Sequence, residues 1–333
     1  MSLTVIEPGM LTSVQDQGRL GFRNLGFSTS GTMDTLAARV SNLMLDNPEN
    51  APVLEFTLTG PTLEFHNPAV IFLGGGKAHA TLDDQRIPAN SAAIVNAGQI
   101  LKIAGLRTGC RGYLAIKNGF QIDKVLGSCS TYLRAQIGGH KGRGLKENDS
   151  LRFTPWPSKT RPLKNRFQPD IAAGHEFTHY LEDPINVQPI RFIRGPQASW
   201  FSGKNQEAFQ NQKYTVRPDS DRMGYRLSGQ KIDSSHADSL ITEGTTTGSI
   251  QIPPQGQPII LMSDCQPTGG YPKIGNIISV DLPRVAQLKP SDTLTFQEVT
   301  VEEAQQELIE QRTSLNRLAI AAKHYWNRIQ DEY

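Results

Sequence analysis

The feature that most restricts the fold of this chain is an internal repeat. The pattern LKxxDxLxF at residues 145–153 recurs 143 residues later, at 288–296. The pattern ExTxTG at 55–60 recurs 188 residues later, at 243–248, and at that second offset IFL at 71–73 corresponds to IIL at 259–261. Because these matches keep their order along the chain, chance similarity between β proteins is a poor explanation, and a duplication is indicated.

Each copy is expected to be built mainly from short strands. Runs of β-branched and aromatic residues alternate with Gly, Pro and Asn turns, a pattern typical of β-barrels and closed sandwiches. We therefore predict a mainly β chain with two homologous domains at 1–157 and 190–299, separated by a Pro-rich linker at 158–189. The two copies begin with a weaker match, residues 3–6 against 190–193.

Two helices stand out from this β pattern. Residues 32–45 place Leu36, Val40 and Leu43 on one face, with Ser30 or Thr32 expected as the N-cap. The C-terminal segment 300–333 begins with the capping box TVEE and continues with apolar residues three and four apart. This seam favours docking on its own chain over docking on a partner, and it consists of Ala304, Leu308, Gln311, Leu315, Leu318, Ala322, Tyr325 and Ile329.

Composition and charge exclude several classes of protein. The chain has 333 residues, a net charge of +2 and no apolar run near the roughly 20 residues that cross a bilayer. No basic region followed by an apolar core begins the sequence, so no signal peptide is expected. Three scattered cysteines, Cys110, Cys129 and Cys265, suit a reducing compartment. We therefore expect a cytoplasmic protein that binds neither nucleic acid nor a membrane.

Two motifs resemble known sites but lack parts of them. His175 and His179 form an HExxH pattern, yet it lies in the Pro-rich linker, so no metal site is expected. The run LGGGK at 73–77 lacks the first glycine and the hydroxyl residue of a phosphate loop. Its glycines are equally consistent with backbone N–H groups that bind an anion and with tight packing.

Two glycine-containing loops carry more polar chemistry than a turn needs. The loop around Arg134, Gly138, Gly139 and Arg143 is cationic, and guanidinium groups bind carboxylate or phosphate through two hydrogen bonds. A solvated basic hairpin is the alternative. The loop containing Thr268, Gly269, Gly270 and Tyr271 joins two strands and offers hydroxyls beside flexible backbone. A plain structural turn explains it about equally well.

Several segments, taken in order, resemble a known family. They are EPGMLTSVQDQGRLGF, STSGTMD, STYLRAQIGGHKGRGLKENDSL, SDRMGYRLSG and QPTGGYPKIGNII. Together they resemble the carboxyltransferase subdomain A/B family, also called allophanate hydrolase subunit 2 or KipI antagonist. The resemblance spans residues 3–296 and implies two cyclophilin-like β-barrels, in agreement with the duplication.

The resemblance also implies a function. Stand-alone bacterial members of the family include the C subunit of an ATP-dependent 5-oxoprolinase, which implies a chain that acts with a KipI-like B subunit and an A subunit. ATP with Mg²⁺ is the implied cofactor, bound to a partner or at an interface, and no biotin is expected on this chain. The alternatives are a regulator that antagonises a KipI-like kinase inhibitor and a biotin-dependent urea or amide carboxyltransferase.

These considerations select the candidate site residues. The residues predicted to line a catalytic site are Asp34, Glu55, Arg222 and Glu243. Those predicted to bind substrate or its anionic groups are Arg134, Gly138, Gly139, Arg143, Thr268, Gly269, Gly270 and Tyr271.

Overall fold

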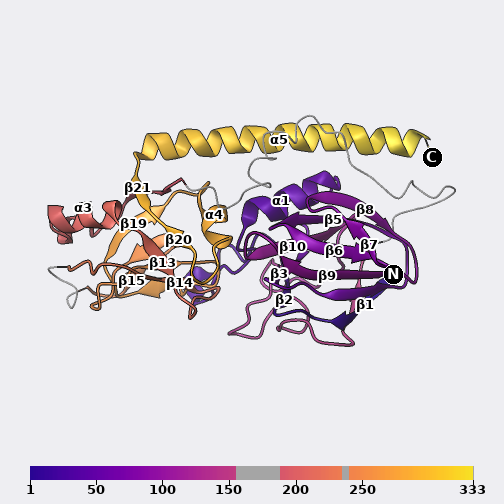
Figure 1. Ribbon diagram of the computed structural model, residues 1–333, viewed down its shortest axis with the longest axis horizontal. Helices are drawn as coiled ribbons and strands as arrows, with labels where there is room; N and C mark the ends of the chain where they lie inside the picture. The colour runs from indigo at the N-terminus through magenta and orange to yellow at the C-terminus, as the bar shows by residue number, and fades with distance from the viewer. Residues whose placement is uncertain (155–187, 235–239, 333) are drawn as a thin grey trace. The chain divides into compact units, whose positions relative to one another are not determined.

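The computed structural model describes residues 1–154, 188–234 and 240–332, which form two compact units (Figure 1). Neither unit is continuous in sequence. The first contains residues 1–18, 34–154 and 312–332, and the second contains residues 19–33 and the described part of 185–311. Residues 19–33, which precede the first helix of copy one, therefore belong to the second unit. The predicted linker at 158–189 lies almost entirely outside the described residues, as does the HExxH motif.

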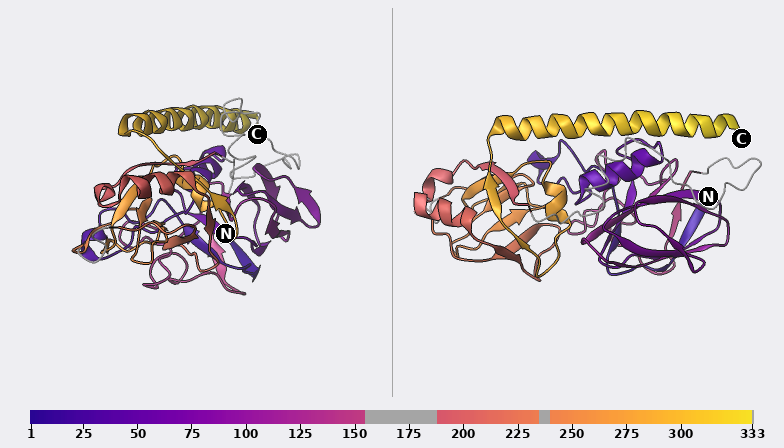
Figure 2. Two further views of the ribbon diagram at one scale, coloured as in Figure 1. Left: turned by 60° about the vertical axis from the view of Figure 1, so that its left-hand side comes forward. Right: turned by 45° about the horizontal axis from the view of Figure 1, so that its top comes forward.

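The first unit is built on eleven described strands. They are β1 (Ser2–Glu7), β2 (Thr12–Gln15), β3 (Val53–Thr57), β4 (Thr62–Phe65), β5 (Ala69–Gly75), β6 (Ala78–Leu82), β7 (Gln85–Ile87), β8 (Ser91–Val95), β9 (Ile100–Leu106), β10 (Arg111–Ile116) and β11 (Ser150–Arg152). One sheet has the order β11-β1-β4-β9-β6-β7 and the other β2-β3-β10-β5-β8. In the right-hand view of Figure 2 the purple strands of this unit curve round a common interior.

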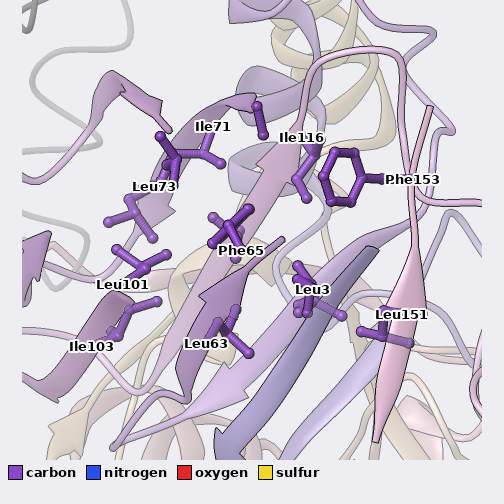
Figure 3. Packing of buried hydrophobic residues seen from close by; sticks show 14 of the residues in the cluster. Leu3, Leu63, Phe65, Ile71, Leu73, Leu101, Ile103, Ile116, Leu151 and Phe153 are labelled. Carbon is purple, nitrogen blue, oxygen red and sulfur yellow. The ribbon is translucent and has the colours of Figure 1, made fainter. Parts of the chain in front are cut away.

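Alternating side chains of both sheets fill that interior. Leu3, Leu63, Leu101 and Ile103 come from one sheet and Ile71 from the other, all at most 1% exposed (Figure 3). Because successive side chains of a strand point to opposite faces, the residues next to these in sequence lie on the outer faces of the sheets or pack against helices. Burial of this single apolar cluster holds the two sheets together.

A second apolar cluster of the first unit lies between the five-stranded sheet and two helices. Helix α1 (Thr35–Met44) begins at Asp34, whose carboxylate accepts a hydrogen bond from the N–H of Ala37 at 2.8 Å, so the expected Ser30 or Thr32 cap was wrong. Helix α5 (Val301–Glu332) buries Leu315, Leu318, Ala322 and Trp326 in the same cluster.

The predicted capping box and part of the seam of α5 are confirmed. The N–H of Thr300 donates to Glu303, and the N–H of Glu303 donates to the hydroxyl of Thr300. The seam holds only in the C-terminal half of the helix, since Leu308 is 43% exposed. The pattern also omitted Trp326, which is buried.

The second unit contains a sheet that nearly closes on itself. Its described strands are β12 (Ile190–Arg194), β13 (Tyr214–Val216), β14 (Gly224–Ser228), β16 (Ser249–Gln251), β17 (Ile259–Leu261), β19 (Lys273–Ile277), β20 (Thr293–Leu294) and β21 (Phe296–Glu298). The order is β20-β13-β14-β17-β16-β19-β12-β21. The two edge strands, β20 and β21, are separated in sequence by Thr295 alone, so the sheet returns to its starting point. The mainly β prediction is confirmed.

Shorter elements complete the second unit. They are helices α3 (Gly203–Asn211) and α4 (Leu282–Ala286), the 3₁₀ turns at Arg23–Leu25 and Ala198–Trp200, and the two-stranded ribbon of β15 (Glu243–Gly244) and β18 (Thr268–Gly269). In the parts of the chain that the structure describes, no helix combines the length and apolar character required to span a bilayer.

The repeated pattern LKxxDxLxF folds alike in both units. The carboxylate of Asp149 accepts from the N–H of Lys146 at 2.8 Å, and Asp292 accepts from Lys289 at 3.0 Å. The backbone hydrogen bonds of the two loops go to strands that the sequence match between residues 3–6 and 190–193 does not pair with each other. The loop pairs with Val5 of β1 in the first unit and with Val216 of β13 in the second, whereas the weaker sequence match to residues 3–6 lies in β12.

Candidate functional site

The four predicted catalytic residues lie in three polar clusters. Asp34 and Glu55 share one cluster in the first unit, whereas Arg222 and Glu243 occupy two separate clusters in the second unit. The clusters differ in how far they are exposed to solvent. Exposure therefore distinguishes clusters that support the fold from one that a substrate can reach.

Asp34 and Glu55 are joined by Tyr113 beneath helix α1. The hydroxyl of Tyr113 donates to Glu55 at 2.8 Å and accepts from the N–H of Asp34 at 2.8 Å. All three residues are buried. Burial, with the nearby Glu55 and Asp34 charges, raises the pKa of Tyr113 well above its ordinary value, so the hydroxyl keeps its proton. This cluster fixes the start of α1 on the sheet and offers no accessible atom for a substrate.

Arg222 holds together loops of the second unit. Its guanidinium bonds both oxygens of Asp264, at 3.0 and 3.1 Å, and donates to the carbonyl of Gly31 at 2.5 Å. Ser30 donates to the same carboxylate at 2.7 Å. Because the Arg222 and Asp264 side chains are about one-twentieth exposed, this pair fixes residues 30–31 against the loop that follows β17.

Glu243 is the accessible member of the third cluster. Its carboxylate lies 2.6 Å from the ammonium of Lys273 and accepts a hydrogen bond from the Gln197 amide at 2.8 Å. The Lys273 bond lowers the pKa of Glu243, so the carboxylate is ionised at neutral pH. The Glu243 side chain is 35% exposed, whereas that of Lys273 is 9% exposed and also donates to the carbonyl of Gly244.

The predicted substrate loop lies directly beside Glu243. In the ribbon of β15 and β18, Glu243 pairs with Gly269 and Gly244 pairs with Thr268. Tyr271 follows and is 43% exposed. The structure therefore brings Glu243 and the Thr268 to Tyr271 loop together, and we take this ribbon and its surroundings as the candidate site, the ribbon site.

Sequence reasoning missed the residue that secures the ribbon. The guanidinium of Arg23 donates to the carbonyl of Thr245 at 2.7 Å and to that of Gln266 at 3.2 Å, the residues after β15 and before β18. Arg23 lies 222 positions from Thr245 in sequence, on the segment that joins the second unit. No spacing rule connects positions so far apart, and no local pattern marked this arginine.

The basic glycine loop has a different construction from the predicted anion site. Arg143 bonds both oxygens of Asp149, at 2.6 and 2.7 Å, and His140 lies 3.1 Å from the same carboxylate. Gly138 and Gly139 have positive φ, and a Cβ on Gly139 would lie 1.8 Å from the hydroxyl of Thr131. Arg143 is thus engaged within the loop, while Arg134 is exposed.

Close packing accounts for the glycines at 74–76. Gly74 and Gly75 end β5, and a Cβ added to Gly74 would lie 2.1 Å from the hydroxyl of Ser41 on α1. Of the two interpretations of this run, the helix contact supports tight packing. Within residues 1–154, 188–234 and 240–332, no group of three His, Cys, Asp or Glu residues is arranged to hold a metal ion.

Comparison with known proteins finds relatives that are similar along most of this chain. Residues 25–298 match the carboxyltransferase domain, subdomain A and B. The chain is 37% identical over 308 residues to the 5-oxoprolinase C subunit of Haemophilus influenzae, across 91% of this chain and 93% of the relative. It is 36% identical to the 5-oxoprolinase C subunit of Escherichia coli, across 95% and 97%.

Larger proteins contain a similar region. The urea amidolyase of Saccharomyces cerevisiae is 32% identical over 89% of this chain, which spans only 16% of that protein. Among solved structures, the urea amidolyase of K. lactis superposes with a TM-score of 0.85 at 32% identity, over 95% of this chain and 20% of that one. TTHA0988 superposes at 0.75 with 30% identity, over 89% and 55%.

Proposed function

Because this chain belongs to the family of the carboxyltransferase domain, subdomain A and B, we propose that it is one component of an ATP-dependent enzyme that hydrolyses 5-oxoproline to glutamate. The observation that carries the proposal is reciprocal coverage: the two relatives named as the C subunit of 5-oxoprolinase match this chain along nearly the whole of both sequences. The urea amidolyases are matched over at most a fifth of their length.

In the proposed reaction the lactam is activated before water attacks. An amide is a poor electrophile, so transfer of a phosphoryl group from ATP to the amide oxygen, with release of ADP, would activate the carbon for attack by water. Cleavage of the ring C–N bond in the adduct would free the amine and leave an acyl phosphate, which a second water would hydrolyse to glutamate and phosphate. The proposed assembly includes a KipI-like B subunit and an A subunit, and ATP with Mg²⁺ binds to a partner or at a shared surface. Because the two bacterial relatives are themselves named as C subunits, they support a multi-subunit enzyme.

The proposed contribution of this chain is the ribbon site. Glu243 is an accessible carboxylate kept ionised by Lys273, and in this state it can orient an attacking nucleophile by accepting a hydrogen bond from it. The backbone of Gly269 and Gly270 carries no side chain that blocks approach. Arg23 keeps the two strands of the ribbon together.

A second candidate is a carboxyltransferase that acts on urea or another amide. The similarity to the urea amidolyase and urea carboxylase of K. lactis, each with a TM-score of 0.85, favours it. In that reaction biotin would have to be supplied by another chain. Sensitivity of the activity to avidin distinguishes the two candidates.

The test is ATP turnover and glutamate release from 5-oxoproline, with this chain alone and with the B and A subunits added. We expect activity only in the complete mixture, and Glu243→Gln to lower kcat by about 100-fold or more through loss of the charged acceptor that orients the nucleophile. Glu298→Gln is the matched control, because Glu298 on the edge strand β21 pairs with Arg194 and makes none of the ribbon contacts described above, so kcat should stay unchanged.

The complex must be shown intact by size-exclusion chromatography for each variant. An intact wild-type complex without turnover contradicts the proposed function and favours a regulatory binder of a KipI-like protein. Turnover that survives Glu243→Gln rejects the ribbon site while leaving the assembly proposal in place.

A further inference from the structure

Three glutamine side chains surround the ribbon site. Gln197 donates its amide to Glu243 and accepts from the N–H of Lys273 at 3.1 Å. Gln251 of β16 and Gln266 lie under Gly269: a Cβ added to that glycine would be 2.8 Å from Nε2 of Gln251 and 3.6 Å from Nε2 of Gln266. None of the three was selected from the sequence.

Gln251 is unusual among them because its donor has no partner. The residue is 2% exposed, and its Nε2 has no hydrogen-bond acceptor among the residues that the structure describes. Buried polar atoms nearly always have a partner, so an unpaired buried amide requires an explanation. Leucine or methionine at this position would avoid the cost of an unsatisfied donor.

The surroundings of Gln251 indicate what would satisfy it. A carboxamide presents a donor and an acceptor side by side, which complements the C=O and N–H of another amide. The neighbouring Glu243 is ionised and repels a free carboxylate at the same position. The nearby guanidinium of Arg23 donates to backbone carbonyls. The chemistry therefore favours a neutral amide group over an anion.

We propose that the carboxamides of Gln251 and Gln266 recognise the amide group of a small lactam or urea-like ligand at the ribbon site. The inference rests on the proposed function and deepens it, since it names the residues that select the substrate class. Gly269 covers Nε2 of Gln251 in this structure, so the ligand reaches the carboxamide when the Gly269 and Gly270 backbone moves aside. Glycine at both positions makes that movement sterically easy.

The first experiment compares Gln251→Met with wild type in the assembled enzyme. We expect KM for 5-oxoproline to rise about tenfold while kcat changes less than about threefold, because Gln251 holds the reacting amide by hydrogen bonds in the bound substrate and transfers no proton or phosphoryl group itself. The melting temperature should rise, because the variant removes an unpaired buried donor. Gln255→Met, at an exposed position in the turn after β16, is the control and should change neither quantity.

The opposite pattern would overturn the inference. A lower melting temperature with an unchanged KM means that Gln251 is a structural residue with no role in binding. If the wild-type enzyme shows no turnover, NMR titration of this chain with 2-pyrrolidinone and with cyclopentanone still tests the inference. If Gln251 recognises an amide, the lactam binds more tightly than the ketone, and the Gln251→Met variant loses that binding. Binding of neither compound to the wild-type chain rejects the inference.

Gly269→Ala supplies an independent check. Its methyl group would press on Nε2 of Gln251, and the backbone at this glycine does not have the positive φ that excludes alanine. We expect KM to rise as in Gln251→Met. In the double variant Gln251→Met, Gly269→Ala, KM should rise no further than in either single variant, because both changes remove the same contact. Additive increases would contradict a shared contact.

Discussion

At the residue scale, the shared fold of the repeated loop depends on one carboxylate in each unit. In the first unit Asp149 accepts two bonds from Arg143 and one from the N–H of Lys146, and His140 lies close by. In the second unit Asp292 has the corresponding backbone bond and a 2.8 Å contact with the side chain of Lys289. The additional guanidinium makes the first loop the more sensitive to acid.

The pH dependence follows from this pairing. The Arg143 guanidinium holds the pKa of Asp149 well below its ordinary value. The contribution of the carboxylate is therefore complete above the unfolded pKa of about 3.9 and is lost as the pH falls toward the folded value. We expect Asp149→Asn to lower the melting temperature at pH 7 and to reduce its decline between about pH 5 and pH 3.

Calorimetry across that pH range measures the effect, with Asp292→Asn as the matched variant of the second unit. Asp292 pairs with the flexible ammonium of Lys289 where Asp149 has the fork of a guanidinium, so Asp292→Asn should lower the melting temperature at pH 7 by less than Asp149→Asn. If the melting temperatures of wild type and Asp149→Asn decline equally steeply with falling pH, the assignment of this acid sensitivity to Asp149 is contradicted.

At the element scale, helix α5 illustrates why a seam in the sequence is only part of a helix interface. Its C-terminal half buries Leu315, Leu318 and Ala322 as the heptad spacing predicted, but Trp326 is the largest buried side chain among the described residues of the unit. The indole N–H of Trp326 donates to the carbonyl of Met44, and the ammonium of Lys117 lies 4.5 Å above the ring.

Trp326→Ala should therefore destabilise the first unit by about 3–5 kcal/mol, the cost of removing a fully buried aromatic side chain. Urea unfolding monitored by circular dichroism measures this change. Ile320→Ala, on the same helix at 60% exposure, should change stability by about 0.5 kcal/mol or less. Similar losses in both variants would mean that α5 contributes to stability mainly through helix formation and little through docking.

At the scale of the whole molecule, residues 19–33 contribute to the core and the buried hydrogen bonds of the second unit. Met33 is buried in its core, Ser28 donates to the carbonyl of Cys265 at 2.8 Å, and Gly31 accepts from Arg222. The second copy thus completes its fold with residues that come before the first helix of copy one. The domain range predicted from sequence, 190–299, does not contain them.

We therefore expect a fragment of residues 188–311 to lack cooperative unfolding and to gain it when a peptide of residues 19–33 is added. Binding satisfies the buried Arg222 and fills the space of Met33, so the peptide shifts the fragment toward the folded state. A peptide with Arg23→Ala and Ser30→Ala is the control and should bind more weakly. A fragment that unfolds cooperatively by itself, with a midpoint unaffected by peptide, would refute the expectation.

The sequence by itself determined the elements whose signals are local or periodic. Strand-rich composition, the capping box at Thr300 and the repeated LKxxDxLxF loop depend on neighbouring residues or on an evident duplication, and each is confirmed. Glu243 and Gly269 were both selected from the sequence, as residues of different roles, and only the ribbon of the folded chain pairs them.

Tertiary structure alone decided which polar residues are accessible and which distant segments meet. Asp34, Glu55 and Arg222 had the residue types of a catalytic site, but burial turned them into supports of helix α1 and of the loops. Arg23, Gln251 and Trp326 owe their positions to contacts between segments far apart in sequence. Such contacts depend on the free energy of packing the whole chain, which no short pattern encodes.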